Sequence, residues 1–449
     1  MKKIFQYIML AVVTIVMASC TSDIEETTAT TGKSNVQLVV GEFPAFGDSQ
    51  TRAIGTPDEG KTSWAEGDEL LLEIDNTSYG RHNATFTYNG KSWELTSGEL
   101  VYLEGDPAYI SHVYYAPNYK WSNTSLMLKK GKVAGTDELI EGKARITGNG
   151  ETITVSFAEA TRKYSRLRIA TLPNEQITVD TEYFTPAGSS DMEQNGNYTL
   201  TSDEKGNAYL YGTFENNSEV TVKYREAALT TYTFSQATES AKSYALDATV
   251  ISANSAEEIK SAIEQKVADG KTTIRLNLAP NAGTNEFMAI REAIKGAAPN
   301  DLGTIELTII GVETIPEEAF YKMLQLKSVR MSDVKEIKKY AFKECQYLTV
   351  VEAPSLNKLY SGAFKKCDQL SKLTFGPINY ADARNWPIFE YITPNIDLIL
   401  SDYQKEMIET DDYLYTANND RDYAGSDEHN SKNFLGREFK SITCRYPVE

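Results

Sequence analysis

The sequence predicts a multidomain, mainly β protein in which an N-terminal β-sandwich region is followed by a short α/β solenoid. Two observations predict this fold class. Short runs of alternating apolar residues, bounded by Gly, Asn, Asp or Pro, fill residues 36–250. From 304 to 378 an apolar pattern instead recurs at one fixed spacing, that of Phe320, Phe342 and Phe364. The length of 449 residues fits this division, because so long a chain exceeds one ordinary hydrophobic core.

Composition argues against several classes of protein. Hydrophobic residues make up 41% and charged residues 24% of the chain, which is typical of a globular protein rather than a disordered one. The formal net charge of −18 argues against non-specific binding to nucleic acid or to an anionic membrane face, since both would repel the chain. The four Cys are too few for a disulfide-stapled scaffold.

The N-terminus has the pattern of a signal peptide. Lys2 and Lys3 precede an apolar run over Tyr7–Ala18, which is shorter than the roughly 20 residues that a membrane-spanning helix needs. The stretch MASC, ending at Cys20, resembles the bacterial lipobox. The resemblance implies a lipoprotein signal peptide that is removed so that Cys20 becomes the first mature residue and carries the lipid. The alternatives are a plain secretory signal with an incidental cysteine, or a buried thiol.

A tether is expected to follow the lipidated cysteine, because residues 21–35 are rich in Thr, Ser and Gly and have no apolar period. The tether begins with the acidic stretch TSDIEE, which looks like the surface-export signal of Bacteroidetes lipoproteins. A solvated acidic linker is the alternative. We therefore expect an outer-membrane lipoprotein that is held by its lipid alone and exposed at the cell surface.

A segment early in the strand-rich region resembles the opening of fimbrillin-like (Mfa-like) domains of Bacteroidetes. Within Thr51–Ile74, Arg52 is followed by a loop and then by Trp64, Gly67 and Asp68, which match the family's pattern of Arg, loop and Trp-x-x-Gly-Asp. A Gly-Asp turn and an aromatic ring at the sheet edge suit the entry into a strand.

A second segment, Val155–Ile169, resembles the stretch in which that family has a Phe followed by basic residues and a strand, although Ala158 and Glu159 stand where the family has His. The resemblance covers 36–250 and implies a transthyretin-like, fimbrillin-like β-sandwich, of which some members polymerise by inserting a strand into the next subunit. It also implies proteolytic processing after Arg52, with an ordinary exposed loop arginine as the alternative. Polymerising members need a C-terminal donor strand, whereas here another domain follows.

Three segments of the C-terminal half align without gaps: IPEEAFYKMLQLKSV, IKKYAFKECQYLTVV and LYSGAFKKCDQLSKL. Four apolar columns keep one register through them. This is the pattern of a solenoid in which each unit adds one short strand to a parallel sheet. The expected repeat core comprises Phe320, Phe342, Phe364, Leu326, Leu348, Leu370, Cys345 and Cys367.

The A-F-x-x-C-x-x-L form of these segments resembles the BspA-type leucine-rich repeat. Cys345 and Cys367 occupy the column in which that family usually has cysteine, and Met323 occupies the same column in the first segment. The interchange of Met and Cys indicates a soft apolar position rather than a reactive thiol. A metal site, a redox pair or a disulfide between adjacent coils are the alternatives.

Both flanks of the repeats are expected to cap the solenoid. Before them, Ser255 and Glu258 form a capping box that opens a helix, and a second helix is predicted around Glu286–Lys295. After them come closing strands and a polar loop rich in Tyr and Asn, which suits carbohydrate or protein contact, or plain solvent. Cys444 has no assigned role. The expected boundaries are signal peptide 1–20, tether 21–35, β-sandwich region 36–250, N-terminal cap 251–303, leucine-rich repeats 304–378 and C-terminal capping region 379–449.

Lysines gather in the repeats of this acidic chain. Between 311 and 378 there are 11 Lys or Arg against 8 Asp or Glu. A basic strip on one side of the coil would attract an acidic partner, although such lysines can also serve solubility alone. The strip would consist of Lys338, Lys339, Lys343, Lys365, Lys366 and Lys372.

No catalytic constellation is found in the sequence. His82, His112 and His429 are scattered, and no metal-ligand, nucleophile-elbow or phosphate-binding motif occurs. We therefore expect no enzyme, no cofactor and no metal. A pair of carboxylates from distant positions is the alternative.

These features predict a cell-surface adhesin or fimbria-associated binding protein, with the sandwich as stalk and the solenoid as protein-recognition surface. The expected partners are the outer membrane through the lipid anchor and a protein or glycan ligand at the surface, with fimbrial subunits if the chain enters a pilus, and no nucleic acid. The alternatives are a glycan-capturing accessory lipoprotein of a nutrient-uptake system, using exposed aromatics such as Trp121, and a polymerising pilus subunit. Coplanar exposed aromatics would indicate a glycan, and a broad mixed surface would indicate a protein.

Overall fold

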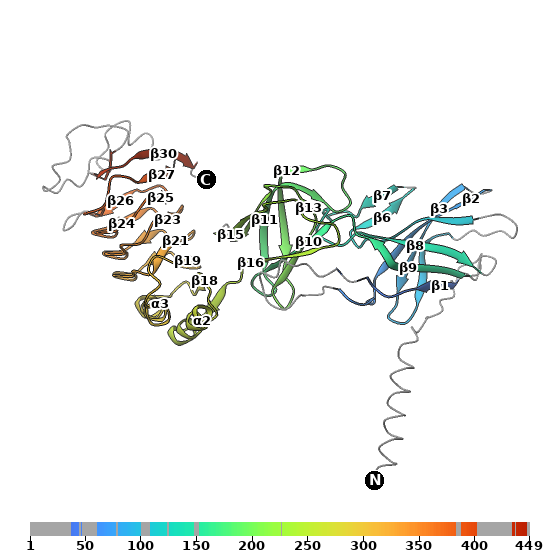
Figure 1. Cartoon of the computed structure of the whole chain (residues 1–449), viewed down its shortest axis with the longest axis horizontal. Helices are drawn as coiled ribbons and strands as arrows, with labels where there is room; N and C mark the ends of the chain where they lie inside the picture. Colours follow the sequence, from blue (N-terminus) through green and yellow to red (C-terminus); the bar gives the residue numbers. More distant parts are fainter. Residues whose placement is uncertain are drawn as a thin grey trace, which may run out of the picture. The chain divides into compact units, whose positions relative to one another are not determined.

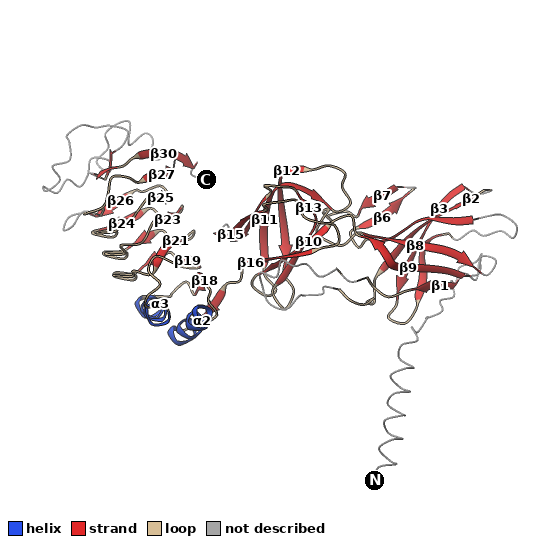
Figure 2. Ribbon diagram, in the orientation of Figure 1, coloured by secondary structure: helices blue, strands red, loops and turns tan. Residues whose placement is uncertain are grey.

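The computed structural model describes residues 37–44, 46, 61–77, 80–99, 108–123, 125–147, 152–225, 227–382, 388–401, 433–435 and 437–446. These residues form a mainly β structure with several sheets and two helices, α2 and α3, as the sequence predicts (Figures 1 and 2). Two compact units divide the chain. Unit 1 comprises Met1–Val222 and Thr231–Asp247, and unit 2 comprises Lys223–Thr230 and Ala248–Glu449.

The first sheet of unit 1 has seven strands in the order β1-β9-β8-β5-β2-β3-β4. Its neighbours are antiparallel except for β1, which pairs in parallel with β9 at one edge. Every strand contributes to one hydrophobic cluster. The strands are β1 (Gln37–Val40), β2 (Glu69–Asn76), β3 (Gly80–Tyr88), β4 (Trp93–Gly98), β5 (Ala108–Tyr115), β8 (Ile140–Thr147) and β9 (Thr152–Thr161), and a separate hairpin consists of β6 (Tyr119–Ser122) and β7 (Ser125–Leu128).

The second seven-stranded sheet has the order β15-β14-β11-β13-β10-β16, with β12 paired to β11. Alternation places its apolar residues in the core: in β14 the side chains of Val220, Val222 and Tyr224 are buried, and the residues between them are partly or fully exposed. The strands are β10 (Ser165–Ala170), β11 (Gln176–Pro186), β12 (Glu193–Thr201), β13 (Asn207–Phe214), β14 (Glu219–Tyr224), β15 (Ala227–Thr233) and β16 (Ser243–Asp247).

Trp64 and Phe157, from the two segments on which the fimbrillin-like expectation rests, meet in unit 1. The Trp64 ring lies 5.4 Å from that of Phe157, and its Nε1 donates to the Gly41 carbonyl at 2.8 Å. Asp68 accepts from the Ala65 amide at 2.7 Å and closes the turn in which Gly67 has a φ of +90°. The Trp-x-x-Gly-Asp pattern thus fixes the chain that follows β1 to the start of β2.

Unit 2 begins with two helices and the first strands of a parallel sheet. The Ser255 side chain accepts from the Glu258 amide at 3.2 Å and the Glu258 carboxylate from the Asn254 amide at 3.0 Å, so the predicted capping box forms. The elements are β17 (Ile251–Ala253), α2 (Ala256–Ala268), β18 (Thr273–Leu278), α3 (Thr284–Ala297) and β19 (Ile305–Ile310).

The remainder of unit 2 is a stack of coils, each of which contributes one strand to an eight-stranded sheet, β17-β18-β19-β21-β23-β25-β27-β30 (Figure 1). Its strands pair in parallel. Four coils add a strand to a second parallel sheet, β20-β22-β24-β26. The strands are β20 (Thr314–Ile315), β21 (Leu326–Arg330), β22 (Glu336–Ile337), β23 (Val350–Ala353), β24 (Lys358–Tyr360), β25 (Lys372–Phe375), β26 (Tyr380–Asp382), β27 (Asp397–Ser401) and β30 (Ser441–Tyr446), and β28 (Asn433–Phe434) pairs with β29 (Arg437–Glu438).

The register of this stack follows the sequence period and then departs from it. Val329 pairs with Val351 and Val351 with Leu373, so these two steps are equal and match the period of the repeated segments. Leu373 then pairs with Leu398, which is a longer step. The next coil is therefore longer than the ones before it but continues the same sheet.

Candidate interaction surface on the repeats

The site residues predicted from the sequence fall into two groups, those outside the described residues and those in the core of the repeats. Cys20 and Arg52, the predicted lipidation and processing sites, lie outside the described residues. The eight residues of the expected repeat core are all buried, with exposed fractions between 0% and 2%. None of these eight is available to a partner, so a recognition surface has to come from other side chains of the coils.

The core columns form a continuous spine. The rings of Phe320, Phe342 and Phe364 stack at 5.1 and 5.4 Å between centroids, and Phe389 of the longer coil continues the stack at 5.8 Å. The Sγ of Cys345 donates to the Phe320 carbonyl at 3.0 Å. Burial raises the pKa of the Cys345 thiol to about 12, which keeps it protonated and unreactive at neutral pH.

Most basic side chains on the two sheets are paired with a neighbouring coil. Glu336 accepts from Lys358 at 2.6 Å and also from Lys338 of its own coil, and these two hydrogen bonds lower the pKa of the Glu336 carboxyl. Exposed pairs of this kind contribute little to stability, because solvent screens them. The other pairs on the sheets are Lys327–Glu306, Lys335–Glu313, Arg330–Glu352, Lys372–Glu352 and Lys440–Asp397.

A different surface lies over the Phe spine, where the chain turns between the two sheets. We call it the turn ridge, and it consists of Tyr321, Lys322, Lys339, Tyr340, Lys343, Glu344, Lys365, Lys366, Glu390 and Tyr391. Its lysines contact aromatic rings: the Lys343 Nζ lies 5.0 Å from the Tyr321 ring and 4.8 Å from the Tyr340 ring. Lys339 also lies 4.8 Å from Tyr340. Each contact is a cation–π arrangement.

The expected basic strip therefore divides in two. Lys338 and Lys372 belong to the ion pairs of the sheets. Lys339, Lys343, Lys365 and Lys366 belong to the turn ridge; of these, Lys365 pairs with Glu390 at 2.5 Å and Lys343 approaches Glu344 only to 3.9 Å. Within the described part of the chain, Lys339 and Lys366 have no ion-pair partner.

Two pairs of aromatic rings among the described residues are inclined rather than coplanar. The Tyr360 and Tyr380 rings are inclined at 50° to each other, and the Lys338 Nζ lies over the Tyr360 ring at 4.4 Å. In unit 1, Trp121 is inclined at 60° to Tyr114. The Tyr-rich loop between β27 and β28 lies outside the described residues. These two pairs offer no flat stacking surface, whereas the His112 and Tyr114 rings lie within 12° of parallel.

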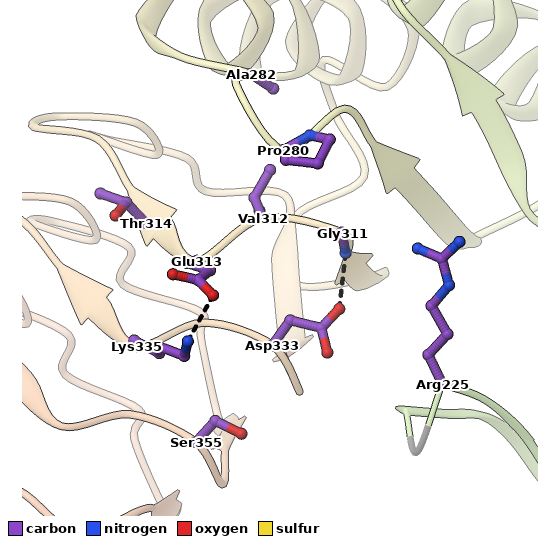
Figure 3. Close-up of a pocket in the computed structure, with 10 residues that line it drawn as sticks. All are labelled: Arg225, Pro280, Ala282, Gly311, Val312, Glu313, Thr314, Asp333, Lys335 and Ser355. Carbon is purple, nitrogen blue, oxygen red and sulfur yellow. Dashed lines mark hydrogen bonds and ion pairs between the residues drawn. The ribbon is translucent and has the colours of Figure 1, made fainter.

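A cavity of about 690 Å³ opens beside the first coils (Figure 3). Two of its charged groups are already engaged: Asp333 accepts from the Gly311 amide at 2.8 Å, and Lys335 pairs with Glu313 at 2.5 Å. Arg225 approaches from the turn between β14 and β15, and none of the residues drawn is aromatic. The cavity thus has neither a stacking surface nor a group of ligands for a metal.

Metal-binding clusters and membrane-spanning helices are both absent from the described residues. No three His, Cys, Asp or Glu there come close enough together to hold a metal ion. His112 contacts Glu141 at 3.3 Å, His82 lies in β3, and His429 lies outside the described residues. None of the helices in the described ranges is long and apolar enough to cross a membrane.

Stacked coils that repeat at a constant period, with buried Leu and Phe columns, define this part of unit 2 as a leucine-rich repeat structure. Residues 302–399 match the family described as "BspA type Leucine rich repeat region" in six copies, which confirms this part of the sequence prediction. Repeats of this type are generally associated with surface adhesion or protein interaction. The match includes the longer coil beyond residue 378. No curated protein matches the chain.

Proposed function

We propose that this chain is a cell-surface lipoprotein that acts as an adhesin or a fimbria-associated binding protein. A fimbrillin-like β-sandwich region would serve as the stalk, and the leucine-rich repeat solenoid as the recognition surface. The match of residues 302–399 to BspA-type repeats carries the proposal, since such repeats are associated with adhesion or protein interaction. Contact area grows with each coil and needs no deep pocket, and the proposal includes no catalytic step.

Anchoring is tested by labelling cells with a lipid precursor. Wild type should incorporate the label and sediment with the outer membrane, and Cys20→Ala should lose both properties. Cys444→Ala is the matched control and should behave as wild type. Protease treatment of intact cells then distinguishes the two faces, since a surface protein is digested and a periplasmic one survives. A chain that keeps its label in Cys20→Ala would contradict the anchor.

Binding is tested with the purified mature chain on arrays of extracellular-matrix proteins and glycans. The proposal expects saturable binding to a protein or to a charged glycan. Exclusive binding to neutral glycans would instead favour the glycan-capturing accessory lipoprotein. Binding to neither class would contradict the proposal.

The pilus-subunit alternative has one structural observation in its favour. The strand β1, which precedes Arg52, lies at a sheet edge, and its removal would open a groove along β9. The chain after β1 is nevertheless well held: Arg162 donates to the Pro44 carbonyl at 2.8 Å, and its guanidinium lies 3.9 Å from the centre of the Phe46 ring. The intact mass of the surface protein distinguishes the two alternatives, because a pilus subunit would begin after Arg52 and the proposed lipoprotein begins at Cys20.

A further inference from the structure

Among the described residues, Lys339, Lys343 and Lys366 of the turn ridge lack the close ion pairs that hold the lysines of the two sheets. The other two ridge lysines, Lys322 and Lys365, pair with Glu344 and Glu390 of the next coil at 3.6 and 2.5 Å. On the sheets, a carboxylate of a neighbouring coil neutralises each of Lys327, Lys335 and Lys358, at 2.5 to 2.8 Å. On the ridge, Lys339 and Lys343 lie against tyrosine rings instead. A cation over a ring keeps its charge available to a further partner, whereas a carboxylate cancels it.

The turn ridge is continuous along the stack. The Lys322 amide donates to the Lys343 carbonyl at 2.9 Å, and the Glu344 amide donates to the Lys365 carbonyl at 2.8 Å. The Lys366 amide donates to the Glu390 carbonyl at 2.8 Å, which extends the ridge onto the longer coil. Successive coils therefore place their side chains at a spacing of about 4.8 Å, that of hydrogen-bonded strands.

These hydrogen bonds also restrict what can bind. An extended acidic peptide gains much of its affinity from open backbone groups at a sheet edge. On the ridge, the amides of Lys322, Glu344 and Lys366 already bond to the next coil. A ligand there is recognised through side chains alone, by lysine ammonium groups and by exposed rings such as Tyr391, which is 63% exposed.

We infer that the turn ridge binds an anionic polysaccharide, with Lys339, Lys343 and Lys366 contacting its sulfate or carboxylate groups and Tyr391 packing against a sugar ring. These lysines come from two adjacent coils, and a linear polyanion that runs along the stack can contact both. The inference rests on the proposed adhesive function and names the ligand class of that same surface. The chain's net charge of −18 repels polyanions elsewhere, so binding has to be local to the ridge.

The test measures the affinity of the full mature chain for heparin, a sulfated polysaccharide, against neutral dextran. The ridge variant combines Lys339→Gln, Lys343→Gln and Lys366→Gln. Its matched control combines Lys327→Gln, Lys335→Gln and Lys358→Gln, which removes the same charge from the sheets. We expect the ridge variant to lose at least about tenfold in affinity and the salt dependence of log K to flatten by about three units, with the control within about twofold of wild type.

Four outcomes would overturn the inference. Equal weakening by the two triple variants would assign the effect to net charge. Equal affinity for heparin and for duplex DNA would show that the ridge binds any polyanion through non-specific electrostatics. Tighter binding of an acidic peptide than of heparin would assign the ridge to a protein partner. If the ridge variant loses heparin but still binds the matrix protein found on the arrays, the inference holds and the adhesive surface lies elsewhere. If heparin is not bound while array binding persists, only the inference fails.

Discussion

At the scale of single residues, the thiol of Cys345 ties stability to pH. Its pKa in the folded chain, about 12, lies above the ordinary value of 9.0 because burial disfavours the thiolate. The stabilisation is complete below about pH 9 and is lost as pH rises toward 12, because only the unfolded thiol ionises in that range. Wild type should lose about 1 kcal/mol more than Cys345→Met between pH 9 and 10.

The measurement is denaturant unfolding of both chains at several pH values. Subtracting one free energy of unfolding from the other removes the contribution of every titrating group that the two chains share. Methionine is the suitable replacement, because Met323 fills the same column in the first coil and is fully buried there. A difference that stays constant from pH 7 to 10 would show that water or a counter-charge reaches the thiol.

A second residue-scale prediction concerns the turns under the ridge. The equivalent residues Glu318, Tyr340 and Gly362 all have a positive φ, at 56°, 56° and 64°. A side chain costs about 1–2 kcal/mol in this conformation, so Gly362→Ala should lower the free energy of unfolding by that amount. Glu318→Gly is the matched change in the opposite direction and should leave the free energy unchanged or raise it by about 0.5 kcal/mol. Equal losses in both variants, measured by chemical denaturation, would refute this explanation.

At the scale of elements, α3 completes the hydrogen bonds of the first coil. In later turns the carbonyl at the position of Lys343 accepts an amide from the preceding coil, but the first coil has no preceding turn. There the Lys295 Nζ donates to the Tyr321 carbonyl at 3.4 Å, and Arg291 donates to the Glu318 carbonyl at 2.8 Å. The double variant Arg291→Met/Lys295→Met should therefore lose about 1–3 kcal/mol of stability.

The control for this cap removes two equally charged side chains from the α2 side of the same unit, Lys260→Met/Lys271→Met, and should cost less than about 0.5 kcal/mol. Hydrogen exchange locates the effect: the amides of Tyr321 and Met323 should exchange faster in the α3 variant and not in the control. Uniform acceleration throughout the coils would argue that α3 stabilises only by its apolar face.

How much of the fold follows from sequence differs between the elements. The coils are predictable because each carries its own copy of a local pattern, so Phe320, Phe342 and Phe364 identify their own turns. Phe389 does not fit the repeated pattern, because its coil is longer than the repeat period. Its ring nevertheless occupies the same stack. In unit 1 the sequence predicts the strands through the alternation of apolar residues, but it does not predict which strands pair with one another. β1 pairs with β9 through Gln37 and Thr152, which are far apart in the chain, and alternation specifies only which side of a strand faces the core.

The candidate surface was predictable to a similar degree. The sequence indicates that lysines gather in the repeats, but Lys338 and Lys339 are neighbours in the chain with different roles. Lys338 directly follows β22 and bonds to Glu336, whereas Lys339 lies in the turn over Tyr340 and belongs to the ridge. Composition cannot separate them, because the separation depends on where the coil leaves a strand and begins its turn.

At the scale of the whole molecule, separate cores predict separate unfolding. The coils share one hydrophobic cluster that runs from Ala253 to Phe439, and the first sheet of unit 1 has its own cluster. Coils stabilise one another as neighbours, so damage to one is transmitted along the stack but not through a different core. Phe342→Ala, at a fully buried ring between two stacked neighbours, should cost about 3–5 kcal/mol and lower one calorimetric transition by several degrees.

Phe86→Ala is the matched variant, because Phe86 is equally buried in the cluster of unit 1. It should lower the other transition and leave that of the coils in place. A single transition that both substitutions shift together would mean that the two units unfold as one. In that case the proposed stalk and the proposed recognition surface would share their stability.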